Sequence, residues 1–135
     1  MTIEELTVGA SASMSKTISE TDVYLFAGIT GDFNPAHINE VAARETRFGG
    51  RIAHGMLSAG LISAVLAMKL PGPGTIYLGQ ELKFTKPVRI GDTVTATCKV
   101  IRLVPEKNLA CLETTCTNES GEVVIQGTAT VMPPH

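Results

Sequence analysis

The chain has 135 residues, of which 44% are apolar and only 18% are charged, and its formal net charge is −2. This length predicts one domain over residues 1–135, because a chain of this size buries about two thirds of its unfolded surface. It has no tryptophan, and its 11 basic residues are not clustered. The sequence therefore lacks the basic patch that is typical of nucleic-acid-binding proteins. The mean hydropathy of +0.20 is high for so small a protein, and we expect part of the apolar surface to meet a second subunit.

No apolar run is long enough to cross a bilayer, and residues 1–5 are acidic where a signal peptide is basic. We therefore expect a cytoplasmic protein with no membrane partner. The three cysteines, Cys98, Cys111 and Cys116, are odd in number and fall in segments that resemble strands, which favours reduced structural thiols. None of them has a metal-ligand spacing with a histidine, so no metal site is expected.

The first half of the chain predicts helices. Ser19, Glu20 and Asp22 precede an apolar pattern that ends near Gly31, which is typical of a capped short helix. Residues 39–47 fit a second short helix. From His54 to Leu70 the only polar side chains after His54 are Ser58, Ser63 and Lys69, and a helix that is apolar on nearly all sides must be surrounded by protein.

After the helix breaker at residues 71–74, the apolar side chains recur every second residue, as they do in strands. Turn residues separate the strands, so the simplest arrangement is an antiparallel meander. Gly79 marks a bulge or a close approach of another backbone. A buried helix with an antiparallel sheet is an α+β architecture. The residues expected to share a face are Ile76, Leu78, Leu82 and Phe84 in the first strand; Val94, Ala96, Cys98 and Val100 in the second; Leu112 and Cys116 in the third; and Val123, Ile125, Ala129 and Val131 in the last.

Residues 31–37 bring a carboxylate, an amide and an imidazole within six positions, on Asp32, Asn34 and His37. Gly31 and Pro35 keep this segment out of regular helix, so the side chains can point to one place. A capped turn at Asn34 is the competing interpretation. A second element favours a site, because His54 and Gly55 open the long helix and its first free N–H groups can bind a developing negative charge.

Together these segments resemble the (R)-specific enoyl-CoA hydratases, which are the stand-alone members of the MaoC-like dehydratase family. The resemblance runs from about Ser19 to Val104 without an evident insertion. It implies the hot-dog fold, in which a curved antiparallel sheet wraps a long central helix. The matching residues are Gly31-Asp32-Phe33-Asn34-Pro35 with His37; His54-Gly55-Met56; Tyr77-Leu78-Gly79-Gln80; Phe84 and Pro87; and Val88, Gly91, Asp92 and Val94.

The implied reaction is reversible hydration of a short- to medium-chain trans-2-enoyl-CoA in fatty acid or polyhydroxyalkanoate metabolism. We expect Asp32 and His37 to supply the base and the proton source, with their individual roles open because their titrations are coupled. We expect the Gly55 N–H to stabilise the thioester oxygen. Asn34, His54 and Ser63 are expected to orient the site or bind substrate. For His54 a structural hydrogen bond is an equal alternative, and Ser58 is expected to be structural.

The resemblance implies no cofactor besides the coenzyme A of the substrate, and a homodimer formed through the sheet edges. No sequence motif identifies a coenzyme A binding site. Scattered cationic side chains could contact its phosphates, namely Arg44, Arg47, Arg51, Lys83 and Lys86. Three other functions remain open. They are a dehydratase linked to acyl carrier protein, a hot-dog thioesterase and a non-catalytic acyl-CoA-binding subunit.

Overall fold

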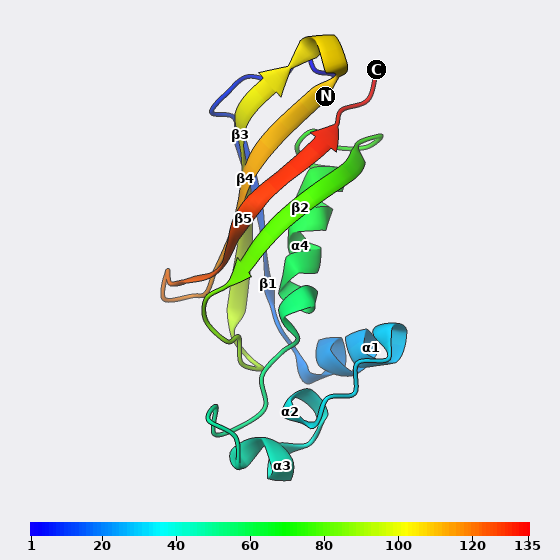
Figure 1. Ribbon diagram of the computed structural model, residues 1–135. Helices are drawn as coiled ribbons and strands as arrows, with labels where there is room; N and C mark the ends of the chain where they lie inside the picture. Colours follow the sequence, from blue (N-terminus) through cyan, green and yellow to red (C-terminus); the bar gives the residue numbers. More distant parts are fainter.

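The computed structural model describes residues 1–135 and contains one five-stranded antiparallel sheet with strand order β1-β3-β4-β5-β2. One long helix, α4 (Gly55–Met68), lies along the sheet and packs mainly on β3 (Figure 1). This is the predicted α+β architecture. The strands are β1 (Ser11–Thr17), β2 (Ile76–Phe84), β3 (Thr93–Val104), β4 (Leu109–Thr117) and β5 (Val123–Met132), and a short 3-10 turn, Pro105–Lys107, links β3 to β4.

Three short helices gather beyond one end of the sheet, where α4 begins, and both termini lie at the other end (Figure 1). These helices are α1 (Glu20–Thr30), α2 (Pro35–Ile38) and α3 (Glu40–Arg44). The first follows the predicted cap, because Ser19 and Asp22 form a reciprocal capping box. It ends at Gly31, whose φ of 81° is the left-handed conformation that glycine adopts without strain.

The segment after Gly31 differs from its prediction. We expected no helix between residues 31 and 37, but α2 begins at Pro35 and includes His37. A proline is tolerated at the first position of a helix, because the N–H that it lacks has no helical partner there. The expected helix over residues 39–47 is present in shorter form as α3, with Asn39 as its cap.

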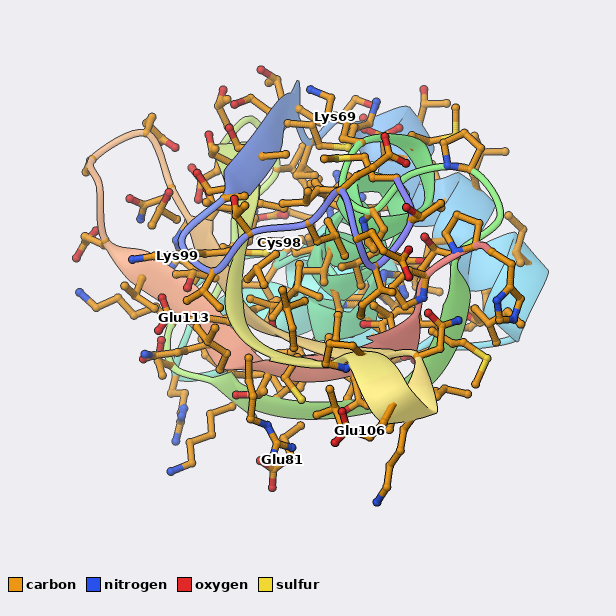
Figure 2. All side chains as sticks on the ribbon, turned by 90° about the horizontal axis from the view of Figure 1, so that it is seen from above. Lys69, Glu81, Cys98, Lys99, Glu106 and Glu113 are labelled. Atoms are coloured by element: carbon orange, nitrogen blue, oxygen red, sulfur yellow. The ribbon has the colours of Figure 1, made fainter.

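The core side of β3 follows its predicted alternation, since Val94, Ala96, Cys98 and Val100 are fully buried. Figure 2 shows Cys98 on the inside of the sheet, while Lys99 and the facing Glu113 extend from its outer surface. The three cysteines are free thiols, as expected. Burial raises the pKa of the Cys98 and Cys116 thiols to about 12, which keeps both protonated near neutral pH.

β1 has no counterpart among the strands that the sequence predicts. This strand pairs with β3 over its whole length at the edge of the sheet. Its sequence is mostly small and polar, and only Ala12 and Met14 are half-buried. The pairing therefore rests on backbone hydrogen bonds to β3, which leave no strong hydrophobic period in the sequence.

The predicted common face of β2 is wrong at its start. The register shifts between Tyr77 and Gly79, so Tyr77 pairs with Val131 whereas Gln80 pairs with Ala129. This bulge at Leu78 moves Ile76 to the face opposite that of Leu82 and Phe84. Gly79 lies next to this bulge, which is one of the two roles considered for it.

A second register shift lies between Cys116 and Thr117 in β4. As a result Val123 is 37% exposed, and Val124 is fully buried in its place. The remaining predicted core positions of β5, namely Ile125, Ala129 and Val131, are buried as expected.

One face of α4 is left uncovered by its own chain, although the sequence predicts a helix that protein surrounds on all sides. Leu57, Ile62 and Val65 are buried against the sheet. The opposite face is exposed at Met56, Gly60, Ser63, Ala67 and Met68. None of the helices is both long and apolar enough to span a membrane.

Candidate active site

A cleft of about 450 Å³ opens where α4 begins. Its walls come from the segment after α1, from α2, from the residues that lead into α4 and from the end of β2 with the loop that follows. The lining residues that carry the argument are Asp32, His37, His54, Gly55, Ser58 and Phe84.

Asp32 lies just after the Gly31 turn, with its side chain exposed in the single chain. Its Oδ1 accepts a hydrogen bond of 3.2 Å from the Asn34 N–H, which directs the carboxylate back over the loop. Asn34 itself caps α2, because its Oδ1 accepts from the Ala36 N–H at 3.0 Å. Asn34 does not line the cleft, so the capped-turn interpretation describes its contacts in the chain.

His37 projects from α2 and is only 9% exposed. Its Nδ1 lies 2.7 Å from the carbonyl oxygen of Ile52. A carbonyl can only accept, so Nδ1 carries the hydrogen and the neutral ring keeps its lone pair on Nε2. The contact with Ile52 therefore selects the tautomer whose Nε2 can accept a proton.

His54 precedes α4 and is 2% exposed, and its side chain makes no capping hydrogen bond to the helix. Instead its Nε2 donates to the backbone carbonyl of Asp32 at 2.9 Å. Its ring also packs against Phe26, with centroids 4.8 Å apart. The structural role considered for His54 is thus present, and it acts on the loop that carries Asp32.

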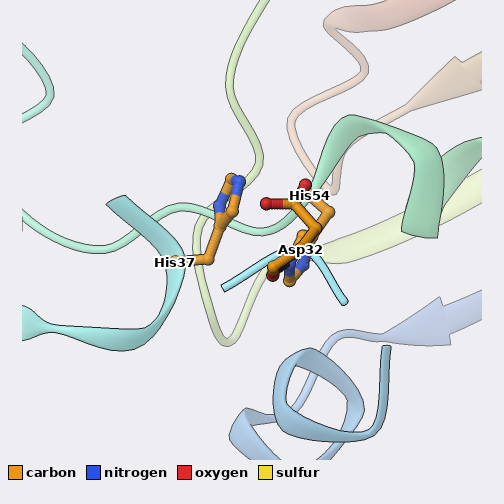
Figure 3. Close-up of side chains that lie close together, drawn as sticks. All are labelled: Asp32, His37 and His54. Carbon is orange, nitrogen blue, oxygen red and sulfur yellow. Dashed lines mark hydrogen bonds between the residues drawn. The ribbon is translucent and has the colours of Figure 1, made fainter. Parts of the chain in front are cut away.

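Figure 3 shows Asp32, His37 and His54 brought together from three separate segments. One oxygen or nitrogen atom of each side chain lies within 4.8 Å of the others. One carboxylate and two imidazoles at this spacing are also a donor set that transition metals use. The three side chains come from separate segments, so no local spacing in the sequence predicts this cluster.

The start of α4 presents unpaired donors to the same cleft. The N–H groups of Gly55 and Met56 make no hydrogen bond within the chain. Such groups at the positive end of a helix bind negative charge. The ring of Phe84 covers Gly55 so closely that a Cβ there would lie 2.7 Å from two ring carbons.

The two serines of α4 lie on different sides of the helix. Ser63, predicted to act at the site, is exposed on the bare face of the helix and does not line the cleft of this chain. Ser58, predicted to be structural, lines the cleft, is fully buried and has a hydroxyl without a hydrogen-bond partner. The available signal in the sequence is that Ser58 belongs to the first turn of α4, shortly after His54 and Gly55.

Of the five cations expected to contact coenzyme A, Arg44, Arg51 and Lys83 do not line the cleft. Arg47 and Lys86 line the cleft, although Lys86 also forms an ion pair with Glu122. Arg51 is instead engaged in a network with Glu20, Tyr24 and Glu40, which joins α1 to α3. Hydrogen bonding to Arg51 lowers the pKa of Glu20.

A model of the MaoC-like domain matches residues 6–121. The chain belongs to the MaoC-like family. This MaoC-like protein is 63% identical over 131 residues to an (R)-specific enoyl-CoA hydratase of Rhodospirillum rubrum, covering 97% of this chain and 90% of that protein. It is 51% identical to a 3-hydroxybutyryl-CoA dehydratase of Methylorubrum extorquens, with 97% and 83% covered.

The family assignment extends to the fold. The solved structure of an (R)-hydratase from Aeromonas caviae, described as involved in polyhydroxyalkanoate biosynthesis, superposes with a TM-score of 0.94 at 42% identity. The match covers 97% of this MaoC-like chain and 99% of that one. The fold is therefore the hot-dog fold that the sequence resemblance implied.

Proposed function

We propose that this MaoC-like protein is an (R)-specific enoyl-CoA hydratase, which adds water to a trans-2-enoyl-CoA and catalyses the reverse dehydration of the (R)-3-hydroxyacyl-CoA. The proposal rests on one observation: the side chains of Asp32 and His37 lie close together at the start of α4, where the first N–H groups of the helix have no partner within the chain. The names of the similar proteins support the same substrate and stereochemistry.

The first step is to hold the attacking water. Two hydrogen bonds of about 2.8 Å each let one water bridge atoms up to about 5.5 Å apart. The polar atoms of Asp32 and His37 lie within 4.8 Å of each other, which fits such a bridge. The water is then oriented by two partners before it meets the substrate.

The next step is proton transfer. His37 Nε2 accepts a proton from the water as the water oxygen bonds to C3 of the enoyl group, and the imidazolium then returns a proton to C2. The electrons of the double bond pass through the enolate to the new C–H bond, so the reaction is redox-neutral. The carboxylate of Asp32 accepts a hydrogen bond from the second O–H of the water, which remains on the product hydroxyl, and stabilises the imidazolium.

The enolate oxygen needs donors that are in place before the reaction. The Gly55 and Met56 N–H groups supply them, because neither has a partner within the chain. Loss of one such donor in other enzymes costs roughly 3 kcal/mol of transition-state stabilisation. A glycine at this position also leaves no side chain between the thioester carbonyl and the backbone.

The remaining substrate contacts follow from the chemistry of coenzyme A. Its phosphates are anionic, and Arg47 and Lys86 at the cleft supply positive charge. Because the addition of water is redox-neutral, no redox cofactor is required, and coenzyme A enters only as part of the substrate.

We also propose a homodimer. The bare face of α4 and the edge strand β2 both expose apolar surface, including Met68 at 70%, Leu78 at 51% and Ile76 at 54%. Large exposed apolar surface with an open sheet edge favours association with a second copy.

The test is the enoyl absorbance of crotonyl-CoA in the presence of the pure protein, followed by chiral analysis of the product. Loss of absorbance with formation of (R)-3-hydroxybutyryl-CoA is the expected result. Release of free thiol would indicate a thioesterase, and binding without reaction would indicate a non-catalytic subunit. Turnover of crotonyl-acyl carrier protein with none of crotonyl-CoA would assign the other carrier.

A further inference from the structure

Three successive backbone N–H groups tie residues 51–53, which lead into α4, to three different parts of the fold. The Ile52 and Ala53 N–H groups donate to backbone carbonyls of α2 and of the loop between β2 and β3, at 3.1 and 2.7 Å. The Arg51 N–H donates instead to a side-chain atom, Oε2 of Glu40, at 3.3 Å. This is the one link of the three that a side-chain substitution can remove.

The middle residue of this segment holds a ring of the candidate active site. The Ile52 carbonyl oxygen lies 2.7 Å from Nδ1 of His37, and so leaves Nε2 of that ring to accept a proton. A hydrogen bond weakens steeply when its acceptor moves out of line. The position of Arg51, one residue before this carbonyl, therefore bears on the proton-accepting nitrogen.

The Arg51 side chain is only 14% exposed and is held by three other side chains. Its Nε donates to the same Oε2 of Glu40 at 3.3 Å. Its Nη1 donates to Tyr24 Oη at 3.0 Å, and its Nη2 donates to Glu20 Oε1 at 2.5 Å. Tyr24 Oη in turn donates to Glu20 Oε1 at 3.1 Å, so these acceptors are themselves linked. An isolated surface ion pair contributes little, but a planar guanidinium that serves several acceptors at once is held in one orientation.

We infer that Arg51 is a positioning residue for His37. Its side chain is anchored on α1 and α3, and its backbone leads directly into the carbonyl that binds the His37 ring. Without these anchors the Ile52 carbonyl is free to shift, and His37 spends less time in the tautomer whose Nε2 accepts a proton. Arg51 does not line the cleft, so it acts through Ile52 and does not touch the reacting atoms.

The experiment compares Arg51→Gln, which removes the guanidinium, with Glu40→Ala, which removes the acceptor shared by the Arg51 N–H and Nε. The chain contains only three histidines, so the ring nitrogens of His37 can be assigned by long-range ¹H–¹⁵N NMR. We expect wild-type His37 to carry its hydrogen on Nδ1, and its nitrogen resonances to shift toward a mixture of tautomers in both variants. In each, kcat for crotonyl-CoA should fall about 10-fold with KM within about twofold. The double variant should lose no more than the more affected single variant, because both substitutions break one set of contacts.

Lys16→Gln is the matched control, since it removes a different ion pair at the first turn of α1, between Lys16 and Asp22. It should change neither the His37 spectrum nor the rate. The inference is wrong if wild-type His37 carries its hydrogen on Nε2, a result that needs no variant to fold. It is equally wrong if folded Arg51→Gln leaves the His37 resonances or kcat unchanged, if it raises KM alone as loss of a coenzyme A contact would, or if the two losses multiply in the double variant. The kinetic half rests on the proposed function, whereas the NMR half stands even if the protein hydrates nothing.

Discussion

The imidazole rings of His37 and His54 stack with centroids 3.9 Å apart, and each is held by a carbonyl from the other's segment. His37 bonds the carbonyl of Ile52, two residues before His54, and His54 bonds the carbonyl of Asp32, five residues before His37. This reciprocal pairing fixes the loop after α1 to the start of α4. The carboxylate and the proton-accepting nitrogen are therefore set in place by the two ring orientations.

Asp32→Asn and His37→Gln should each lower kcat for crotonyl-CoA by about 10²-fold or more, because each removes a group that handles the proton of water. Asn keeps the Oδ1 acceptor that binds the Asn34 N–H, so the loop should keep its conformation. Enoyl absorbance gives the rate and circular dichroism checks the fold. Near-normal turnover in either folded variant would remove the pair from the mechanism.

Gly55→Ala should lower turnover about 10-fold, because its Cβ would lie 2.7 Å from the Phe84 ring and displace that ring into the cleft. Gly55→Val should lose more, since a β-branched side chain cannot swing clear. Phe84→Ala provides the matched control. When Phe84→Ala is already present, adding Gly55→Ala should lower turnover far less than it does in the wild type. The affinity for crotonyl-CoA must be measured together with the rate. Wild-type turnover in Gly55→Val would place the oxyanion site elsewhere.

Removal of metal ions by dialysis against EDTA should leave the hydration rate unchanged, because the proposed proton path uses only the Asp32 and His37 side chains. Asp32, His37 and His54 nevertheless offer ligand atoms within 4.8 Å of one another. A mechanism that requires a metal ion is therefore the alternative that this experiment tests. Loss of activity on dialysis, with recovery on addition of Zn²⁺, would overturn the metal-free mechanism.

Light scattering should give twice the chain mass of 14.2 kDa at micromolar concentration. Gly60→Arg should convert this dimer to monomer, because Gly60 lies on the bare face of α4 with no atom of its own chain within 4 Å of an added Cβ. Ser120→Arg, in the exposed turn before β5, should remain dimeric. A monomeric wild type, or a dimer that tolerates Gly60→Arg, would show that this face is not the interface.

Asp22→Asn should lower the free energy of unfolding by about 1 kcal/mol at pH 7, because it weakens the capping box of α1. The backbone N–H of Ser19 holds the pKa of Asp22 below its ordinary value, with Lys16 a smaller contributor. A carboxylate with a lowered folded-state pKa stabilises the protein above its unfolded pKa of about 4 and loses that contribution as pH falls through the folded value. Urea titrations of wild type and variant should therefore converge below about pH 4. A stability gap independent of pH would contradict the charged cap.

Some elements of this fold are determined by residues close together in the sequence. The helix from Glu20 follows from Ser19, Asp22 and Gly31, which all lie within one short segment. The buried face of β3 follows from a strict alternation that a pleated strand requires. Features of this kind are encoded within a few residues, so the sequence predicted them.

The placement of the site residues follows a different rule. Asp32, His37 and Gly55 were identified from residue type and family resemblance, but nothing local to them predicts a hydrogen bond between His54 and the Asp32 carbonyl. The same holds for the Phe84 ring over Gly55, which depends on where β2 meets the start of α4.

The sequence by itself thus determined the long apolar helix, the alternating strands and the residue types of the site, because periodicity and capping act over single turns and strands. Only the tertiary structure decided the pairing of β1, the bulge at Leu78 and the placement of Ser58 in the cleft rather than Ser63. These depend on backbone hydrogen bonds and packing between segments tens of residues apart, and such contacts leave no periodic signal in either segment.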